Sequence, residues 1–183
     1  MLHDAVSAVL RVVGGRPAFR IYGRASYEPE WHVIDVFSTR RRDVASRWPL
    51  WRGTCITWAA GAIAVGRDFA AMVLAEQMRE PASREWPVVV AGGRLLDWRR
   101  RLPAGAASQP SASEVLAHEC GHTGQARRMD FLYWPLGATL TLFREGEKWW
   151  NCFENEASAT GQFGGIVDGS VDERLLAAVR NPR

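Results

Sequence analysis

The order of apolar and polar residues predicts a chain that begins with a helix followed by strands. Residues 2–13 carry apolar side chains at helical spacing and stop at a Gly-Gly pair, which predicts a short amphipathic helix. The next two segments, 18–27 and 31–39, are rich in aromatic and β-branched residues and are separated by Glu28-Pro29-Glu30. This pattern predicts two strands joined by a turn.

The middle of the chain is less regular. The run TCITWAAGAIAV at 54–65 predicts a strand, although its Ala and Gly residues would equally suit a tightly packed helix. Residues 69–78 predict a helix and 86–91 a further short strand. A loop rich in Pro, Gly, Ala and Ser follows at 102–110 and leads into a well-marked helix start.

That helix start fits a capping box, in which the hydroxyl of Ser111 would cap the first turn and Glu114 would reach back to it. The apolar segment 131–143 is interrupted by Pro135 and Gly137, and a polar stretch follows at 144–148. A second helix is predicted from about residue 150, and a short terminal helix at 172–179. The two most apolar runs, 56–65 and 131–143, are shorter than the roughly 18–20 residues that cross a bilayer, so both predict buried elements and no membrane span.

Composition is typical of one domain that spans residues 1–183, because 47% of the residues are hydrophobic and can form a core. The net charge of +3 is mild, and no nucleic-acid partner is expected. The first residues lack the basic and apolar regions of a secretory signal, which predicts a cytoplasmic protein. Three widely spaced cysteines favour reduced thiols over a disulfide framework.

The capped helix contains an HExxH motif, with His118, Glu119 and His122 at its three defining positions. Histidines four residues apart project from the same face of a helix and can bind one zinc ion. Glu119 has the position at which metallopeptidases carry the base that deprotonates the attacking water. Cys120, two residues after His118, lies on another face and is predicted to contribute to packing.

A catalytic zinc site usually has three protein ligands, so one more is required. The remaining histidines, His3 and His32, both precede the motif, which excludes a downstream histidine ligand. The acidic residues after the motif helix are therefore the candidates, and the helix that contains FENEAS is preferred because its small residues would allow close approach to an ion. These acidic residues are Asp130, Glu145, Glu147, Glu154, Glu156 and Asp168.

Taken together, HECGHTGQ, LYWPLGATLTLF and ENEAS resemble the zincin metallopeptidases, in particular the gluzincin-like group whose third ligand is a glutamate on a later helix. The chain is also similar to small bacterial proteins assigned as peptidases, in which HExGHxxQ precedes ExxA[NDS]. The resemblance covers about residues 54–165, which would form the metallopeptidase core after an N-terminal helix and strand pair at 1–50.

The resemblance implies an α+β, zincin-like fold, in which a small, twisted, mostly antiparallel sheet packs on the HExxH helix and on a second helix that carries the third ligand. An edge strand, expected within 56–65, would lie above the zinc and could pair with an extended substrate. Matching ExxA selects Glu154 as third ligand, whereas the Asn-Glu-Ala tripeptide of thermolysin-like enzymes selects Glu156. The Asp that often follows such a ligand by four residues is replaced by Ser158, or by Thr160 in the second alignment.

The resemblance thus implies a zinc-dependent peptidase that hydrolyses a peptide or protein substrate, with His118, His122 and Glu154 as Zn²⁺ ligands and Glu119 as general base. Tyr133, His32 and Arg127 are candidates for stabilising the oxyanion. Two alternatives remain. The domain could bind metal or protein without catalysis, as the serine at 158 would suit, or the motif helix could be structural in an interaction module, where nine tryptophans would suit binding.

Overall fold

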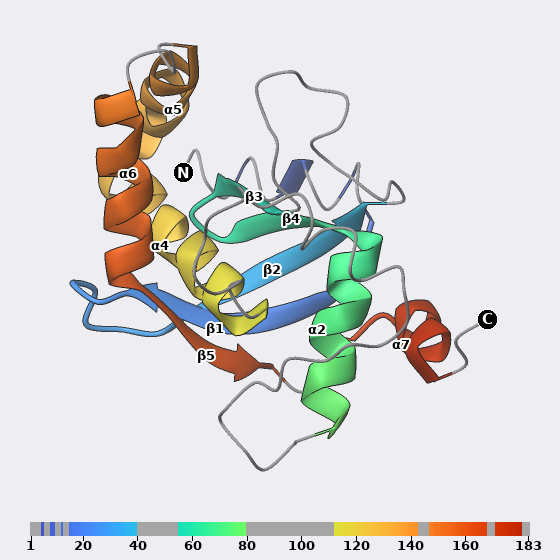
Figure 1. The fold of residues 1–183 in the computed structure, drawn as a ribbon. Coiled ribbons are helices and arrows are strands. Elements are labelled where there is room, and N and C mark those ends of the chain that lie inside the picture. Colours follow the sequence, from blue (N-terminus) through green and yellow to red (C-terminus); the bar gives the residue numbers. More distant parts are fainter. Residues whose placement is uncertain are drawn as a thin grey trace.

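The expected α+β class is confirmed by a sheet of five strands with helices packed on it (Figure 1). The computed structural model describes residues 15–39, 55–79, 112–142, 147–167 and 171–180, and the single positions 5, 8, 9 and 12. The strand order is β3-β4-β2-β1-β5. The strands are β1 Phe19–Ala25, β2 His32–Thr39, β3 Cys55–Ala59, β4 Ala62–Gly66 and β5 Gly161–Ile166.

Three of the four strand pairs are antiparallel, and only β2 and β4 run parallel. The predicted strand pair at 18–27 and 31–39 is confirmed as β1 and β2. Side chains of β1 alternate, because successive residues of a strand point to opposite faces: Phe19 and Ile21 are buried, whereas Arg20 and Tyr22 are exposed. This alternation gives the sheet one apolar face for the helices.

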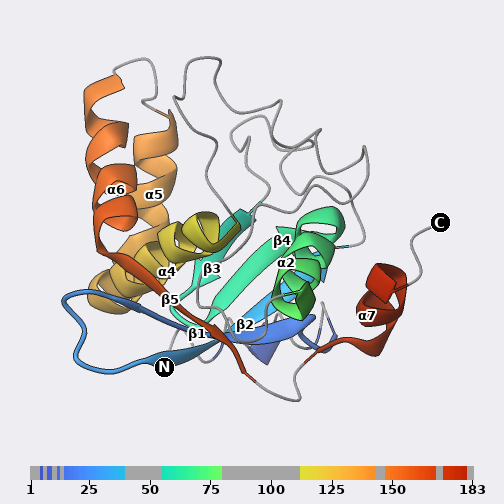
Figure 2. The ribbon, with the colours of Figure 1, turned by 60° about the horizontal axis from the view of Figure 1, so that its bottom comes forward.

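Two helices, α2 and α4, cover that face, whereas α5 and α6 lie at one end of the sheet and α7 lies at the other, beyond α2 (Figures 1 and 2). Apolar residues of α2 and α4, among them Phe69 and Leu116, share a core with Ile21, Ile34 and Ile63 of the strands. The helix α6 packs against α4, and α7 packs against α2. The helices are α2 Arg67–Arg79, α4 Ala112–Met129, α5 Tyr133–Leu142, α6 Glu147–Thr160 and α7 Glu173–Arg180, with a 3₁₀ turn η1 at Asp130–Leu132.

The prediction of one strand at 54–65 is wrong. The segment forms two antiparallel strands, β3 and β4, which turn at Ala60 and Gly61. A run of small apolar residues hides such a turn, because both strands and the turn between them are buried or half-buried and no polar residue marks the reversal. The hairpin makes β3 an edge strand of the sheet, so only the first half of the predicted strand has the edge position expected from the zincin resemblance.

The prediction that 131–143 is buried is also wrong in part. The segment forms η1 and α5, and Phe131, Leu132 and Leu136 are 67%, 46% and 42% exposed. Pro135 does not break α5, because it lies in the first helical turn, where the amide hydrogen it lacks would have no helical partner. The following helix α6 begins at Glu147, earlier than predicted, and includes part of the polar stretch 144–148.

The helices predicted at 69–78 and 172–179 are confirmed as α2 and α7. The strand predicted at 86–91, the loop at 102–110, the cap Ser111 and most of the helix at 2–13 lie outside the described residues. In the described part of the chain, no helix has the length and apolar character required to cross a membrane.

Candidate metal centre

The helix α4 carries both motif histidines on the side that faces α6. Its ends suit the helix dipole, since Glu114 lies in the first turn and Arg127 and Arg128 lie in the last. After Met129 the chain leaves the helix at Asp130, whose φ of 50° is in the left-handed region that aspartate tolerates better than most residues. The motif therefore lies within a continuous helix, and its two imidazoles project side by side.

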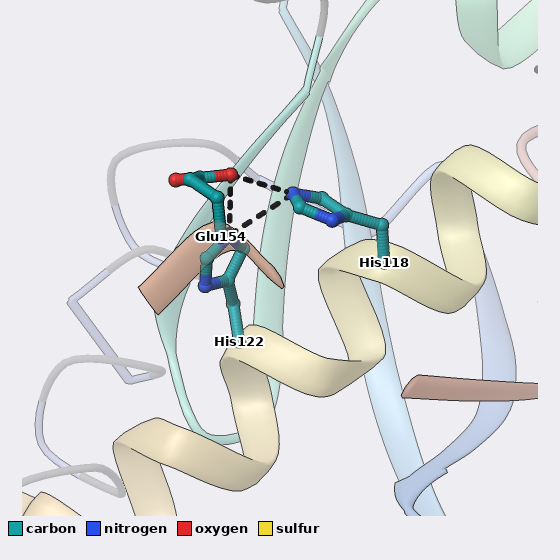
Figure 3. Close-up of side chains that lie close together, drawn as sticks. All are labelled: His118, His122 and Glu154. Atoms are coloured by element: carbon teal, nitrogen blue, oxygen red, sulfur yellow. Dashed lines mark hydrogen bonds and ion pairs between the residues drawn. The ribbon is translucent and has the colours of Figure 1, made fainter. Parts of the chain in front are cut away.

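Three side chains converge at one point, His118 and His122 from α4 and Glu154 from α6 (Figure 3). The Nε2 atoms of the histidines are 3.1 Å apart, and Glu154 Oε2 lies 2.9 Å from His118 Nε2 and 3.3 Å from His122 Nε2. Among the described residues this is the one group of three His, Cys, Asp or Glu side chains that could hold a metal ion. The exposed fractions of the three side chains are 25%, 9% and 27%, so the group is reachable from solvent.

This donor set fits a zinc-sized cation. Tetrahedral ligands about 2.0–2.2 Å from zinc are about 3.3–3.6 Å from one another, so the observed spacings of 2.9 to 3.3 Å would have to widen by only a few tenths of an ångström. Two imidazoles and one carboxylate leave a fourth position open, which is the composition of many catalytic zinc sites. The same donors would accept other divalent transition metals, so the geometry does not specify the metal.

Close packing of α6 on α4 aligns Glu154 with the histidines. Ala157 is fully buried at this contact, and a Cβ added to Gly121 would lie only 2.7 Å from Ala157 Cα and closer still to its carbonyl oxygen. Glu154 precedes Ala157 by three residues and so lies on the same face of α6. Glu156 lies on another side, where its carboxylate contacts Gln125 and Arg128 instead of the histidines.

Each histidine has a partner at its other ring nitrogen. His118 Nδ1 lies 2.8 Å from Ser158 Oγ, and His122 Nδ1 lies 2.8 Å from Gln125 Oε1. Such partners orient a ligand and hold its ring nitrogens in the required protonation pattern. Ser158 therefore occupies the position that the zincin resemblance indicated, whereas the contact of Gln125 was not predicted.

Glu119 is nearly fully buried beneath the edge strand. Thr57 Oγ1 of β3 lies 2.8 Å from Glu119 Oε2 and 3.0 Å from Glu119 O, so the hydroxyl can donate to either oxygen. The hydroxyl links the edge strand to the motif helix and orients the carboxylate. Nothing in the sequence around Thr57 marked it as part of the site, because the sequence pattern does not show which helix a strand crosses.

Hydrogen bonds and charges in the site oppose the effect of burial on the pKa values of Glu154 and His122. Burial raises the pKa of Glu154, but hydrogen bonds from His118 and His122 outweigh it and lower that pKa to about 2. Burial lowers the pKa of His122, but the hydrogen bond to Glu154 and the charge of Glu119 outweigh it and leave the pKa raised. The carboxylates thus give the site a negative character that would attract a cation.

The three oxyanion candidates lie in different places. Tyr133 is buried, its ring is 5.8 Å from that of Phe153, and its pKa is raised by burial and by the charges of Glu119 and Glu154. Arg127 binds both carboxylate oxygens of Glu28 and the carbonyl of Ala60. His32 lies 3.6 Å from the same Glu28. Tyr133 is therefore the candidate whose surroundings include the site carboxylates, whereas the other two pair with Glu28.

The remaining candidates fall elsewhere. Cys120 is fully buried in the main core and is not part of the group of three. Asp130 follows the last residue of α4 and is likewise outside the group. Glu145, Asp168 and His3 lie outside the described residues, as does the side chain of Glu147.

No protein-family model matches this chain, and no curated protein or solved structure matches it. The resemblance to the zincins therefore rests on the motif residues, and a cluster of two histidines and a glutamate does not by itself identify a zincin.

Proposed function

We propose that the protein is a zinc-dependent metallopeptidase with a zincin-like site. The observation that supports this most directly is the convergence of His118, His122 and Glu154, since the motif helix supplies two of the donors and a later helix the third. His118, His122 and Glu154 would hold the ion. The zinc ion would polarise the scissile carbonyl and lower the pKa of a water molecule.

Glu119 is the proposed general base. Its carboxylate would take a proton from the attacking water and deliver it to the leaving amine. Thr57 supports this role, because a hydroxyl that donates to Glu119 Oε2 holds one carboxylate oxygen and leaves the other to receive the proton. Tyr133 is the proposed donor to the oxyanion, because burial and two nearby carboxylates keep its phenol protonated and able to donate a hydrogen bond.

The edge strand β3 is the proposed place of an extended peptide substrate. It lies at the end of the sheet and contacts α4 through Thr57, next to the proposed base. A peptide could add to this edge by main-chain hydrogen bonds. The carbonyl of Trp58 already accepts a hydrogen bond from Trp134 Nε1 at 2.8 Å, so pairing would use the remainder of the strand.

A matched pair of variants tests the metal ligands. Glu154→Gln should lose zinc, measured as metal per protein after purification, whereas Glu156→Gln two residues away should keep it. His118→Ala should lose zinc as well. Stoichiometric zinc in Glu154→Gln, or none in the unaltered protein, would contradict the proposed site.

The catalytic proposal is tested separately with Glu119→Gln. This variant should bind zinc as the unaltered protein does and lose hydrolysis of peptide substrates, because an amide cannot accept the proton. If the unaltered protein binds zinc but hydrolyses no peptide in a broad library, the second candidate is favoured, a zincin-like module that binds metal or protein without catalysis. The hydroxyl of Ser158 beside His118, where a carboxylate would orient the ring more strongly, is the observation that favours this candidate.

A further inference from the structure

Gln125 lies in the middle of a polar row that runs from the metal centre to the surface. It is fully buried, one turn after His122 on α4, and touches three groups. Its Oε1 is 2.8 Å from His122 Nδ1, and its Nε2 is 2.9 Å from Phe153 O and 3.0 Å from Glu156 Oε2. Glu156 Oε1 in turn accepts a hydrogen bond of 2.6 Å from Arg128 Nη2.

These partners fix the orientation of the amide. A backbone carbonyl and a carboxylate only accept hydrogen bonds, so the amide end that contacts Phe153 and Glu156 must be the NH₂ group. The opposite end, the oxygen, then faces His122. Because that oxygen can only accept, His122 Nδ1 must carry a hydrogen. In the neutral ring the lone pair is then on Nε2, the atom that faces His118 and Glu154. When Nε2 carries a hydrogen as well, the ring is a cation that donates to Glu154.

The partner of His118 does not determine which ring nitrogen carries the hydrogen. Ser158 offers a hydroxyl, which can donate or accept, so it does not select which ring nitrogen of His118 carries the hydrogen. The two histidines therefore differ in how their protonation pattern is fixed. The hydrogen on His122 Nδ1 is fixed through Gln125 by two acceptors on α6, Phe153 O and Glu156. The hydrogen position of His118 is not fixed by Ser158 and depends on the other contacts of the ring.

We propose that Gln125 and Glu156 are positioning residues, which hold His122 as the tautomer with hydrogen on Nδ1 and thereby prepare Nε2 to bind the metal. The inference rests on the proposed function only for the measurement of zinc affinity, since the contacts of Gln125 with His122, Phe153 and Glu156 are present without a metal. It gives Glu156, the rejected alternative ligand, a place in the site that does not involve contact with the ion. Arg128 donates to the other oxygen of Glu156, and its guanidinium lies 5.0 Å from the centre of the Tyr27 ring. These two contacts stabilise the position of Glu156 at the surface end of the row.

The direct test is NMR of ¹⁵N-labelled, metal-free protein, because two-bond ¹H–¹⁵N correlations distinguish the two neutral tautomers of each histidine. In the unaltered protein, at a pH at which His122 is neutral, its ring should carry the hydrogen on Nδ1. Gln125→Met, which keeps the length of the side chain but removes the amide, should shift His122 toward the other form. Ser158→Ala is the matched control, and should alter the signals of His118 while those of His122 remain.

A second experiment measures zinc affinity by competition with a chromogenic chelator. Loss of an outer partner of a ligand typically weakens binding about 10- to 100-fold, which is the effect expected for Gln125→Met. The exchange Glu156→Leu should weaken zinc by a smaller factor, whereas Glu156→Gln, which retains an oxygen that can accept from Gln125, should restore most of the affinity. This rescue separates a positioning role from simple packing. Because Glu156 is partly exposed, its variants should fold and test the positioning role even if Gln125→Met does not fold.

Two results would overturn the inference. One is a neutral His122 that carries its hydrogen on Nε2 and none on Nδ1 in the unaltered, metal-free protein. The other is unchanged His122 signals and unchanged zinc affinity in both Gln125→Met and Glu156→Leu. If the unaltered protein bound no zinc at all, the proposed function would fail, but the tautomer measurement would still decide the positioning role.

Discussion

The close contact between α4 and α6 predicts that Gly121→Ala destabilises the protein, although alanine is the better helix former. Helix propensity alone would give a gain of about 1 kcal/mol. The added Cβ, however, would lie 2.7 Å from both Cα and the carbonyl carbon of Ala157, and closer still to its oxygen. These are backbone atoms, so no side chain can rotate away and the two helices must separate.

The magnitude follows from these opposing effects. Overpacking of a core typically costs about 1–3 kcal/mol, and a backbone neighbour places this case at or above the upper end. After subtraction of the propensity gain, the net loss is about 2 kcal/mol or more. For a chain of this length, a loss of about 2 kcal/mol lowers the melting temperature by about 4–8 °C.

A matched control is present in α5. Gly137 is also helical, but a Cβ added there would have no atom within 4 Å. Gly137→Ala should therefore show the propensity gain alone, about 0.5–1 kcal/mol, and raise the melting temperature slightly. Urea denaturation should show that the two variants change the free energy of unfolding in opposite directions and differ by at least about 2.5 kcal/mol.

The same separation should weaken the metal centre. Glu154 lies one turn before Ala157, so a shift of α6 away from α4 moves its carboxylate away from both histidines. We expect zinc affinity to fall at least about tenfold in Gly121→Ala, as when a contact that supports a ligand is lost, and to stay unchanged in Gly137→Ala. A Gly121→Ala protein as stable as the unaltered one, with full zinc affinity, would refute the reasoning.

Three further predictions concern the base, the pH dependence and the thiols. Thr57→Val, which removes the hydroxyl beside Glu119, should keep zinc and lower peptide hydrolysis about tenfold, as loss of an outer partner does, whereas Thr139→Val on the exposed side of α5 should leave both unchanged. In the metal-free protein, the raised pKa of His122 adds stability that is complete below pH 6.5 and is lost as the pH rises through that pKa. The pKa of Glu154 is lowered from 4.5 to about 2, which adds stability that is complete above pH 4.5 and is lost toward pH 2. Urea midpoints should therefore show the largest contribution of this pair between pH 4.5 and 6.5, and His122→Gln should flatten the profile; an unchanged profile would contradict the pairing. Finally, the exposed Cys152 should react with a thiol reagent in the native protein, whereas Cys120, whose pKa is raised by burial and by the charge of Glu119, should react only on unfolding, and equal labelling rates would show that the core assignment is wrong.

The sequence predicted the elements whose signals are local. The helices at 69–78 and 172–179 and the strand pair before residue 40 follow from periodicity within each segment, and all of them form. The hairpin of β3 and β4 could not be predicted in this way, because its turn at Ala60 and Gly61 lies in an apolar run and no polar residue marks it. The exposure of Phe131 and Leu136 on α5 likewise depends on what packs beside that helix and not on its own residues.

Parts of the candidate site were likewise predictable from local sequence, whereas other parts depended on tertiary packing. The spacing of His118 and His122 alone determined that both side chains share one face of a helix, since i and i+4 adjacency is a property of the helix itself. Which of Glu154 and Glu156 lies beside the histidines was decided only by tertiary structure, because it depends on which side of α6 faces α4. The contact between Gly121 and Ala157 sets that rotation. Thr57 and Gln125 became recognisable as parts of the site only when the packing of β3 and α6 on the motif helix brought them to Glu119 and His122.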